Sequence, residues 1–348
     1  MPNVVLVTGV GRFLGGYLAS RLAVDPGIDR VLGVDTVAPP RDLLRRMGRA
    51  EFVRADIRNP LIAKIITSAK VDTVVHTSMS SQGATARADM KEMNVIGTMQ
   101  LLAACQQSSW IRKIVVKSTS AVYGVSPRDP AIFTEDMEPK ELPSSGYAKD
   151  AVEIEEYVRG FARRRPDVDI TTLRFTDLVG PRIDDMITRY FGLPVIPTVL
   201  GYDARLQMLH SEDALTVLER SVVDDVPGVF NVGGDGILML SQAIRRAGRV
   251  SVPVPGLAVS SLKSALGGMQ NYALPSGWMQ FLNFGRVVDT TKMRKRFDFE
   301  PRWTTRQAFD DFVNGRGLRP WLSHEQVTSV EHGVNDAVAR IHRGRNNA

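Results

Sequence analysis

A glycine-rich turn near the start of the chain has the composition of a phosphate-binding loop. Residues 8–16 read TGVGRFLGG and directly follow an apolar run. Glycines in such a turn let backbone N–H groups and the positive end of the following helix approach a pyrophosphate. Twenty residues beyond Gly15, Asp35 ends the next apolar run, where its carboxylate can accept hydrogen bonds from an adenosine ribose. The turn and the carboxylate together predict a dinucleotide site.

Short apolar runs alternate with segments of helical periodicity as far as about residue 174. The runs are Val4–Thr8, Val31–Asp35, Glu51–Ala55, Val74–His76, Lys113–Ser118 and Ile170–Leu173. Segments 15–23 and 94–105, which lie between them, carry apolar residues at helical spacing. The alternation predicts an α/β fold with a doubly wound parallel Rossmann sheet, which would place ligands at the carboxyl ends of its strands.

The pattern loosens after residue 174 and predicts three parts. Residues 1–174 form a dinucleotide-binding Rossmann domain, to which part of 205–235 returns. Residues 175–323 form a smaller C-terminal domain that binds substrate and caps the site, with helices at 211–221 and 241–247. We expect residues 257–284, where charged and amide side chains interrupt the apolar positions, to form a lid or capping piece of this domain. Residues 324–348 form a basic tail that reads as a fraying surface helix.

Composition excludes other classes of protein. The 348 residues are 43% hydrophobic and 24% charged, which is typical of a soluble globular chain. A single Cys105, no apolar stretch of membrane-spanning length and no secretory leader predict a cytoplasmic protein. The net charge of +6 is spread over short clusters that read as solvated helix faces, so no nucleic-acid partner is expected. The five histidines show no metal-ligand spacing, and no metal site is expected.

Further motifs give the chain a resemblance along about 310 residues. In order they are TGVGRFLGG at 8–16, ADIR at 55–58, VDTVVH at 71–76, NVIGT at 94–98, STSAVYG at 118–124, LRFTDLVGP at 173–181, HSEDA at 210–214 and FNVG at 230–233. This series resembles the extended short-chain dehydrogenase/reductases, the NAD-dependent epimerase/dehydratase family. UDP-glucose 4-epimerase is one of the activities found in that family. The resemblance implies a nucleotide-sugar substrate, and often a homodimer built through a helix bundle.

The resemblance also implies which residues hold the cofactor and carry out catalysis. The cofactor would meet Gly9, Gly11, Arg12, Phe13, Leu14, Gly15, Asp35, Asp56, Ile57 and Asn94, with Asp56 facing the adenine. Thr119 matches the Ser or Thr that hydrogen-bonds the reacting sugar oxygen, and Tyr147 matches the tyrosine that takes its proton. The substrate diphosphate would lie near Asp177, Arg205 and Arg286.

One departure from the family removes a catalytic group. The family has a lysine four residues after the tyrosine, and this chain has Ala151 there. Lys149 cannot replace it on a regular helix, because residues two apart point to nearly opposite sides. If that lysine normally lowers the phenol pKa by about three units, its loss costs roughly 4 kcal/mol, or about a thousandfold in rate. The sequence therefore predicts a degenerate active site.

Two other departures concern the ligands. Arg12 occupies the family's middle glycine, and an arginine there could pair with the 2′-phosphate of NADP or turn outward. The carboxylate of Asp35 would repel that phosphate, so NAD is the predicted cofactor and NADP the alternative. Asp177 replaces an asparagine, and an ionised carboxylate accepts hydrogen bonds but repels a diphosphate.

Three functions fit these residues. The first is an NAD-dependent nucleotide-sugar epimerase or dehydratase, with UDP-glucose/UDP-galactose 4-epimerase as the example. The second is a non-catalytic NAD(P)-binding sensor or scaffold that has lost the lysine. The third is a simple NADP-dependent reductase of carbonyl compounds. A fold alone does not choose between them, because function depends on the site.

Overall fold

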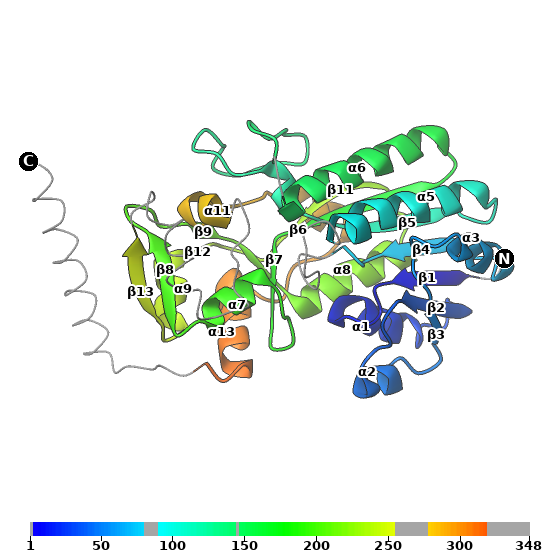
Figure 1. The fold of residues 1–348 in the computed structure, drawn as a ribbon, viewed down its shortest axis with the longest axis horizontal. Coiled ribbons are helices and arrows are strands. Elements are labelled where there is room, and N and C mark those ends of the chain that lie inside the picture. Colours follow the sequence, from blue (N-terminus) through cyan, green and yellow to red (C-terminus); the bar gives the residue numbers. More distant parts are fainter. Residues whose placement is uncertain (1–2, 80–89, 144–145, 255–277, 319–348) are drawn as a thin grey trace, which may run out of the picture.

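The computed structural model describes residues 3–79, 90–143, 146–254 and 278–318. A large sheet with helices on both faces occupies one side of the molecule, and smaller sheets with their own helices lie beside it (Figure 1). The predicted tail at 324–348 and most of the predicted lid at 257–284 lie outside the described residues.

Seven parallel strands form the large sheet. In sheet order they are β11 (Gly228–Val232), β6 (Asp169–Phe175), β5 (Lys113–Thr119), β4 (Thr73–His76), β1 (Val4–Thr8), β2 (Arg30–Asp35) and β3 (Glu51–Arg54). The order reverses direction beside β1, so the carboxyl ends of β1 and β4 meet at the switch point where doubly wound sheets bind ligands. The six apolar runs form six of these strands, and the predicted α/β class is confirmed.

Helices cover both faces of this sheet because its buried side chains alternate between them (Figure 1). Val5 and Val7 of β1 face the cluster that contains α1 and α8, whereas Val4 and Leu6 face the cluster of α3, α5 and α6. These helices are α1 (Phe13–Leu22), α3 (Leu61–Ser68), α5 (Gly97–Gln107), α6 (Gly146–Arg164) and α8 (Ser211–Val223), and the short α2 (Arg41–Arg46) follows β2. A π-helical turn, η1 (Glu92–Ile96), runs directly into α5 where the sequence predicts a regular helix.

The second part of the chain builds three small sheets. Their strands are β7 (Asp177–Val179) with β10 (Met208–His210), β8 (Val195–Val199) with β13 (Val250–Val254), and β9 (Arg205–Leu206) between β12 (Leu238–Met239) and β14 (Gly285–Arg286). Their helices are α7 (Met186–Gly192), α9 (Leu240–Arg246), α11 (Trp278–Phe284), α12 (Thr291–Phe297) and α13 (Thr305–Gly315). A separate apolar cluster, which includes Phe191, Phe309 and Phe312, fills this part. The segment from α8 to β11 returns to the large sheet.

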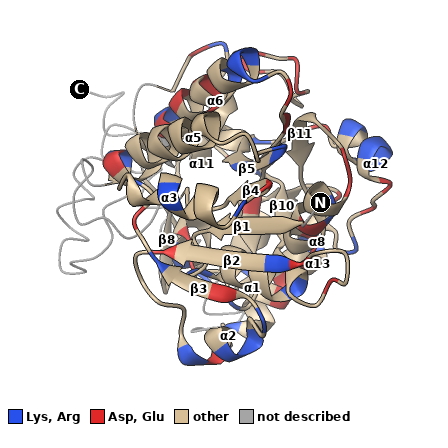
Figure 2. Cartoon of the chain, turned by 90° about the vertical axis from the view of Figure 1, so that its right-hand side faces the viewer, with Lys and Arg blue, Asp and Glu red and all other residues tan. Residues whose placement is uncertain are grey.

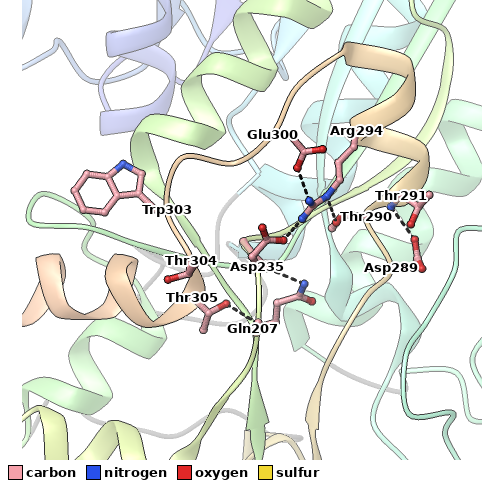
Figure 3. A network of polar contacts seen from close by, with 12 residues as sticks. Gln207, Asp235, Asp289, Thr290, Thr291, Arg294, Glu300, Trp303, Thr304 and Thr305 are labelled. Carbon is pink, nitrogen blue, oxygen red and sulfur yellow. Dashed lines mark hydrogen bonds and ion pairs between the residues drawn. The ribbon is translucent and has the colours of Figure 1, made fainter.

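Arg294 joins three segments of the second part (Figure 3). Its guanidinium pairs with Asp235, which follows β11, and with Glu300, and its Nε donates to Thr290 Oγ1 at 3.2 Å. The carbonyl of Asp235 accepts the Thr305 N–H at 2.7 Å at the start of α13. We call this group, Arg294 with Asp235 and Glu300, the Arg294 brace.

Basic residues lie on separate helices in the view of Figure 2, with blue segments on α2 and α12 and acidic segments between them. The last turn of α2 carries Arg45 and Arg46, and that of α12 carries Arg294, Lys295 and Arg296. No helix in the described ranges is long and apolar enough to cross a membrane.

Candidate functional site

The glycine turn after β1 is held by close backbone contacts. Gly9 has a φ of +76°, and a Cβ there would lie 2.8 Å from Ser78 Cα, so only glycine fits. A Cβ on Gly15 would lie 2.5 Å from the carbonyl oxygen of Gly9. The N–H of Gly9 donates to the Val34 carbonyl at 2.9 Å, which fixes the turn against β2.

The start of α1 suits an anionic ligand. Arg12 is the N-cap in extended conformation, makes no side-chain cap, and no acidic residue lies in the first turn. The first N–H groups of a helix lack partners within the helix, and the helix dipole adds positive potential there. Phe13 and Leu14 follow in that first turn; Leu14 is buried, and the Phe13 ring lies tilted against the Tyr17 ring with 4.5 Å between their centroids. An uncapped, carboxylate-free N-terminus fits the pyrophosphate of a dinucleotide.

Asp35 lies beside this turn at the end of β2. Its Oδ2 accepts the Gly11 N–H at 2.9 Å, and its Oδ1 accepts the Val37 N–H at 3.2 Å. The Thr36 hydroxyl also donates to Oδ1, at 3.4 Å. A carboxylate has about four acceptor positions, so capacity remains for a ribose hydroxyl. A Cβ on Gly11 would lie 3.0 Å from that Oδ2, which explains the glycine. The residues therefore fit NAD.

Arg12 turns along the carboxyl ends of the strands. Its Nη1 donates to the Ser78 carbonyl at 3.3 Å, just beyond β4. Loss of surrounding water lowers the pKa of Arg12, and the nearby Asp35 and Tyr147 oppose that shift. The guanidinium thus lies within electrostatic reach of both the predicted ribose ligand and the predicted catalytic tyrosine.

The other predicted cofactor residues have protein partners. Arg58 donates to both carboxylate oxygens of Asp56, with Nη2 to Oδ2 at 2.6 Å, and lowers the pKa of that carboxyl group. Ile57 is buried where α5 begins. Asn94 lies buried in η1, and its Nδ2 donates to Asp150 of α6 at 3.2 Å. No role for Arg58 was predicted from the sequence.

The two predicted catalytic residues lie on adjoining elements of the larger part. Thr119 ends β5, and its Oγ1 accepts the Ala121 N–H at 3.2 Å. Tyr147 lies in the first turn of α6 and packs partly against the apolar cluster on that face. Ala151, four residues later, is fully buried in the same cluster. Lys149 turns away from Tyr147 to Glu153 on the outer face, with Nζ 3.9 Å from Oε1.

Lys117 is a residue that sequence reasoning missed. It lies on β5 two residues before Thr119, and its Nζ lies 3.4 Å from Tyr147 Oη and 3.2 Å from the Met79 carbonyl. A lysine near the end of a buried, valine-rich strand was the signal available in the sequence. The family motif points only to position 151, so it does not predict a role for a lysine on this strand.

A buried network fixes β5 and α6 behind this contact. Ser118 Oγ donates to Glu155 Oε1 at 2.6 Å, and Glu155 Oε2 pairs with Arg174 Nη2 at 2.7 Å. Arg174 Nη1 also donates to Tyr123 Oη at 2.8 Å. The network joins α6, which carries Tyr147, to the carboxyl ends of β5 and β6.

His76 is a neutral, structural histidine. Its Nδ1 lies 2.9 Å from Thr8 Oγ1 and its Nε2 lies 2.8 Å from Thr98 Oγ1. Because the Thr98 hydroxyl donates to the Asn94 carbonyl, Nε2 carries the proton and Nδ1 accepts. Burial lowers the pKa of His76 to about 4, and the charge of Lys117 adds to that shift.

Two carboxylates lie on the predicted substrate side. Burial raises the pKa of Asp177 on β7 to about 6, and the charge of Arg286 opposes the shift. Burial also raises the pKa of Asp185, the N-cap of α7, to about 7. A hydrogen bond from the Thr188 N–H lowers the Asp185 value, and the charge of Asp177 raises it further. The sequence did not single out Asp185.

The two predicted arginines come from neighbouring strands of one small sheet. Arg286 on β14 donates from Nε to the Gly124 carbonyl at 3.0 Å, and its guanidinium lies 5.5 Å from the Phe281 ring centroid. Arg205 on β9 donates to the Ala131 carbonyl at 3.0 Å. The charges of Arg286 and Asp177 act on each other, so Arg286 lies near the carboxylates of the predicted substrate side. No such contact connects Arg205 with it among the described residues.

The description of the matching family model is "NAD dependent epimerase/dehydratase family", and the match covers residues 5–233, about two thirds of the chain. The chain belongs to the NAD-dependent epimerase/dehydratase family. The predicted resemblance is therefore confirmed, and NAD as the predicted cofactor agrees with the family's description. Among the described residues, no three His, Cys, Asp or Glu side chains gather closely enough to hold a metal ion.

Individual members of the family show how far the likeness extends. The chain is 53% identical over 332 residues to Uncharacterized protein Rv0501 of Mycobacterium tuberculosis, covering 95% of this chain and 88% of that protein. The UDP-glucose 4-epimerase of Thermotoga maritima, solved with UDP-glucose, matches with a TM-score of 0.67 and 20% identity over 90% of this chain and 98% of that one. The dTDP-glucose 4,6-dehydratase of Bacillus anthracis, solved with NAD, matches with a TM-score of 0.68 and 18% identity over 90% and 96%. At these identities the two solved structures share the fold.

Proposed function

We propose that this protein is an NAD-dependent enzyme that oxidises a hydroxyl group of a nucleotide sugar, as an epimerase or dehydratase does. The observation that carries the proposal is that the segment after β4 contacts both the glycine turn and the group around Tyr147. The Ser78 carbonyl accepts from Arg12 Nη1 at 3.3 Å, and the adjacent Met79 carbonyl accepts from Lys117, whose Nζ lies 3.4 Å from Tyr147 Oη. This segment brings the dinucleotide turn and a proton-accepting side chain to one edge of the sheet, as hydroxyl oxidation needs.

The chain's own residues have distinct roles in this proposal. The α1 N-terminus and Asp35 would hold NAD, which when bound is the acceptor of a hydride. Tyr147 accepts the proton of the sugar hydroxyl, and Thr119 donates a hydrogen bond to the same sugar oxygen. Arg286 would hold the diphosphate of the substrate, because a guanidinium binds phosphate oxygens in a planar, two-pronged geometry.

UDP-glucose and UDP-galactose are the substrates to test first. The purified protein is incubated with NAD and either sugar, the absorbance of reduced nicotinamide is followed, and the two sugars are separated by chromatography. We expect interconversion without net consumption of NAD, and loss of turnover in Tyr147→Phe. Several UDP- and dTDP-sugars are tried in parallel, because the specific sugar is the finer part of the proposal.

Other outcomes would support the two alternatives. NAD binding by calorimetry without reduced nicotinamide or product for any sugar would contradict the enzyme proposal and favour a sensor or scaffold. Net oxidation of added NADPH by small carbonyl compounds would favour a reductase. The carboxylate of Asp35 beside the turn argues against that reductase, because it would repel a 2′-phosphate.

A further inference from the structure

The lysine that lies four residues after the catalytic tyrosine in the family is absent from this chain. Position 151 holds an alanine that is fully buried among apolar side chains of α6 and its neighbours. The nearest lysine of α6, Lys149, faces Glu153 and is 44% exposed. Any cation that acts on Tyr147 must therefore come from another element.

Lys117 of β5 reaches the hydroxyl of Tyr147 from the sheet. Its Nζ lies 3.4 Å from Oη and 6.0 Å from the centroid of the tyrosine ring, so the ammonium lies at the hydroxyl end of the side chain. A second hydrogen bond, to the Met79 carbonyl at 3.2 Å, holds the ammonium between β4, β5 and α6. The contact joins residues that are 30 positions apart in the chain.

The charges around Lys117 leave its ammonium available to the tyrosine. Among the described residues, no carboxylate forms an ion pair with it. His76 of β4, which feels the charge of Lys117, has a pKa lowered to about 4 and is neutral. Arg12 of the glycine turn donates to the Ser78 carbonyl at 3.3 Å and feels the charge of Tyr147, and Asp185 at the start of α7 feels the charge of Lys117. Lys113, earlier on the same strand, instead pairs with Asp225 at 2.8 Å.

We propose that Lys117 replaces the missing lysine of the family and stabilises the phenolate form of Tyr147. The inference rests on the proposed function for its chemistry. The O–H bond of the sugar hydroxyl breaks, its proton binds to the Tyr147 oxygen, and the ammonium of Lys117 keeps all three of its protons. Because Lys117 acts through Tyr147, it is a positioning residue. In this proposal β5 supplies the positive charge that the family's helix lysine would supply, and the active site is not degenerate.

The direct test needs neither substrate nor cofactor. The ultraviolet absorbance of tyrosinate is titrated in wild type and in Tyr147→Phe, and the difference isolates Tyr147 from the other tyrosines. The same difference is taken in the Lys117→Met background. We expect the wild-type midpoint to lie at least about one pH unit below the Lys117→Met midpoint, a tenfold change in the ionisation equilibrium. Equal midpoints would overturn the proposal.

Controls separate charge from structure. Lys117→Arg keeps the charge and is expected to restore part of the midpoint shift, whereas a purely structural role for Lys117 would give no such recovery. Lys149→Met removes a nearby lysine that faces Glu153 and is expected to leave the midpoint unchanged. If neither Lys117→Met nor Lys117→Gln folds, the wild-type titration decides alone, and a midpoint equal to that of free tyrosine overturns the proposal.

Once a sugar substrate is identified, the rate of turnover provides a second measurement. Lys117→Met is expected to lower kcat about tenfold to a thousandfold near neutral pH and to move the rising limb of the pH–rate profile to higher pH. Lys149→Met should keep the wild-type profile. A normal profile in Lys117→Met would refute the role of Lys117 while the enzyme function stands. A shifted titration without turnover for any sugar would support Lys117 and refute the enzyme function, so the two failures are distinguishable.

Discussion

Asp177 and Asp185 titrate within the range in which enzymes usually work. Their pKa values are raised to about 6 and about 7 by burial, and the charge of Asp177 acts on Asp185. A carboxyl group that is protonated can donate a hydrogen bond, whereas its ionised form repels phosphate. The asparagine of the family is thus replaced here by a group whose charge depends on pH.

Replacing Asp185 by asparagine should stabilise the protein at high pH only. The folded pKa of about 7 lies above the ordinary value of 3.8, so the stability contributed by proton binding is fully present below about pH 4 and is lost as the pH rises through about 7. Asp185→Asn keeps an acceptor for the Thr188 N–H but cannot ionise. We expect it to gain up to about 4 kcal/mol over wild type at about pH 8 and nothing at about pH 4, measured by urea unfolding.

The neighbouring Asp184 is the matched control, because its pKa is lowered by Arg189, whose Nη2 lies 2.8 Å from Oδ2. A lowered pKa contributes stability above the unfolded value, so Asp184→Asn should lose stability at about pH 8. The loss should stay below about 1 kcal/mol because the pair is exposed. The same gain for Asp185→Asn at both pH values would show that Asp185 does not titrate in this way.

Asp35→Asn tests the choice of cofactor. The amide still accepts the Gly11 N–H but lacks the charge that repels a 2′-phosphate. We expect NAD affinity to fall about tenfold and the preference for NAD over NADP to narrow, measured by titration calorimetry with both cofactors. Asp42→Asn, an exposed carboxylate on α2, should change neither affinity. An unchanged ratio of the two affinities would remove Asp35 from the ribose site.

At the scale of elements, α6 is anchored by a buried ion pair. The side chains of Glu155 and Arg174 are 6% and 11% exposed, and Ser118 adds a hydrogen bond from β5. Glu155→Gln leaves a buried guanidinium without its counter-charge and should lower the free energy of unfolding by about 3 kcal/mol. Glu153→Gln, on the same helix but in partly exposed pairs, should cost less than about 1 kcal/mol. Equal losses in denaturant unfolding would show that burial of the pair contributes nothing.

Local pattern explains which elements the sequence could predict. Strands β1, β2, β4 and β5 follow runs of buried Val and Ile, and the glycine turn follows from positions such as Gly9 where a Cβ cannot fit. The contact between Lys117 and Tyr147 joins separate elements, so a motif read along one helix could not find it. Asp185 could not be predicted either, because an aspartate that caps a helix has the sequence pattern of a structural residue. The π-helical start of α5 has no local signal either.

At the scale of the molecule, the proposed site takes its residues from two parts of the chain. The glycine turn, Lys117 and Tyr147 belong to the large sheet and its helices, whereas Asp177, Asp185 and Arg286 come from the second part. A change in the second part should therefore alter substrate binding and leave cofactor binding intact. The Arg294 brace (Figure 3) offers a test, because α12 follows closely in the chain on β14, which carries Arg286.

Arg294→Met should weaken substrate binding and leave NAD binding intact. It removes the ion pairs that join α12 to Asp235, in the segment after β11, and to Glu300, in the connection between α12 and α13. We expect KM for the nucleotide sugar to rise about threefold or more, and Tm to fall by about 2–4 °C, since these partly exposed pairs contribute about 1 kcal/mol. Arg296→Met, an exposed residue of the same helix, should change neither. If NAD affinity, measured by calorimetry, fell as far as substrate affinity, the brace would support the large sheet, and the two parts would bind their ligands as one unit.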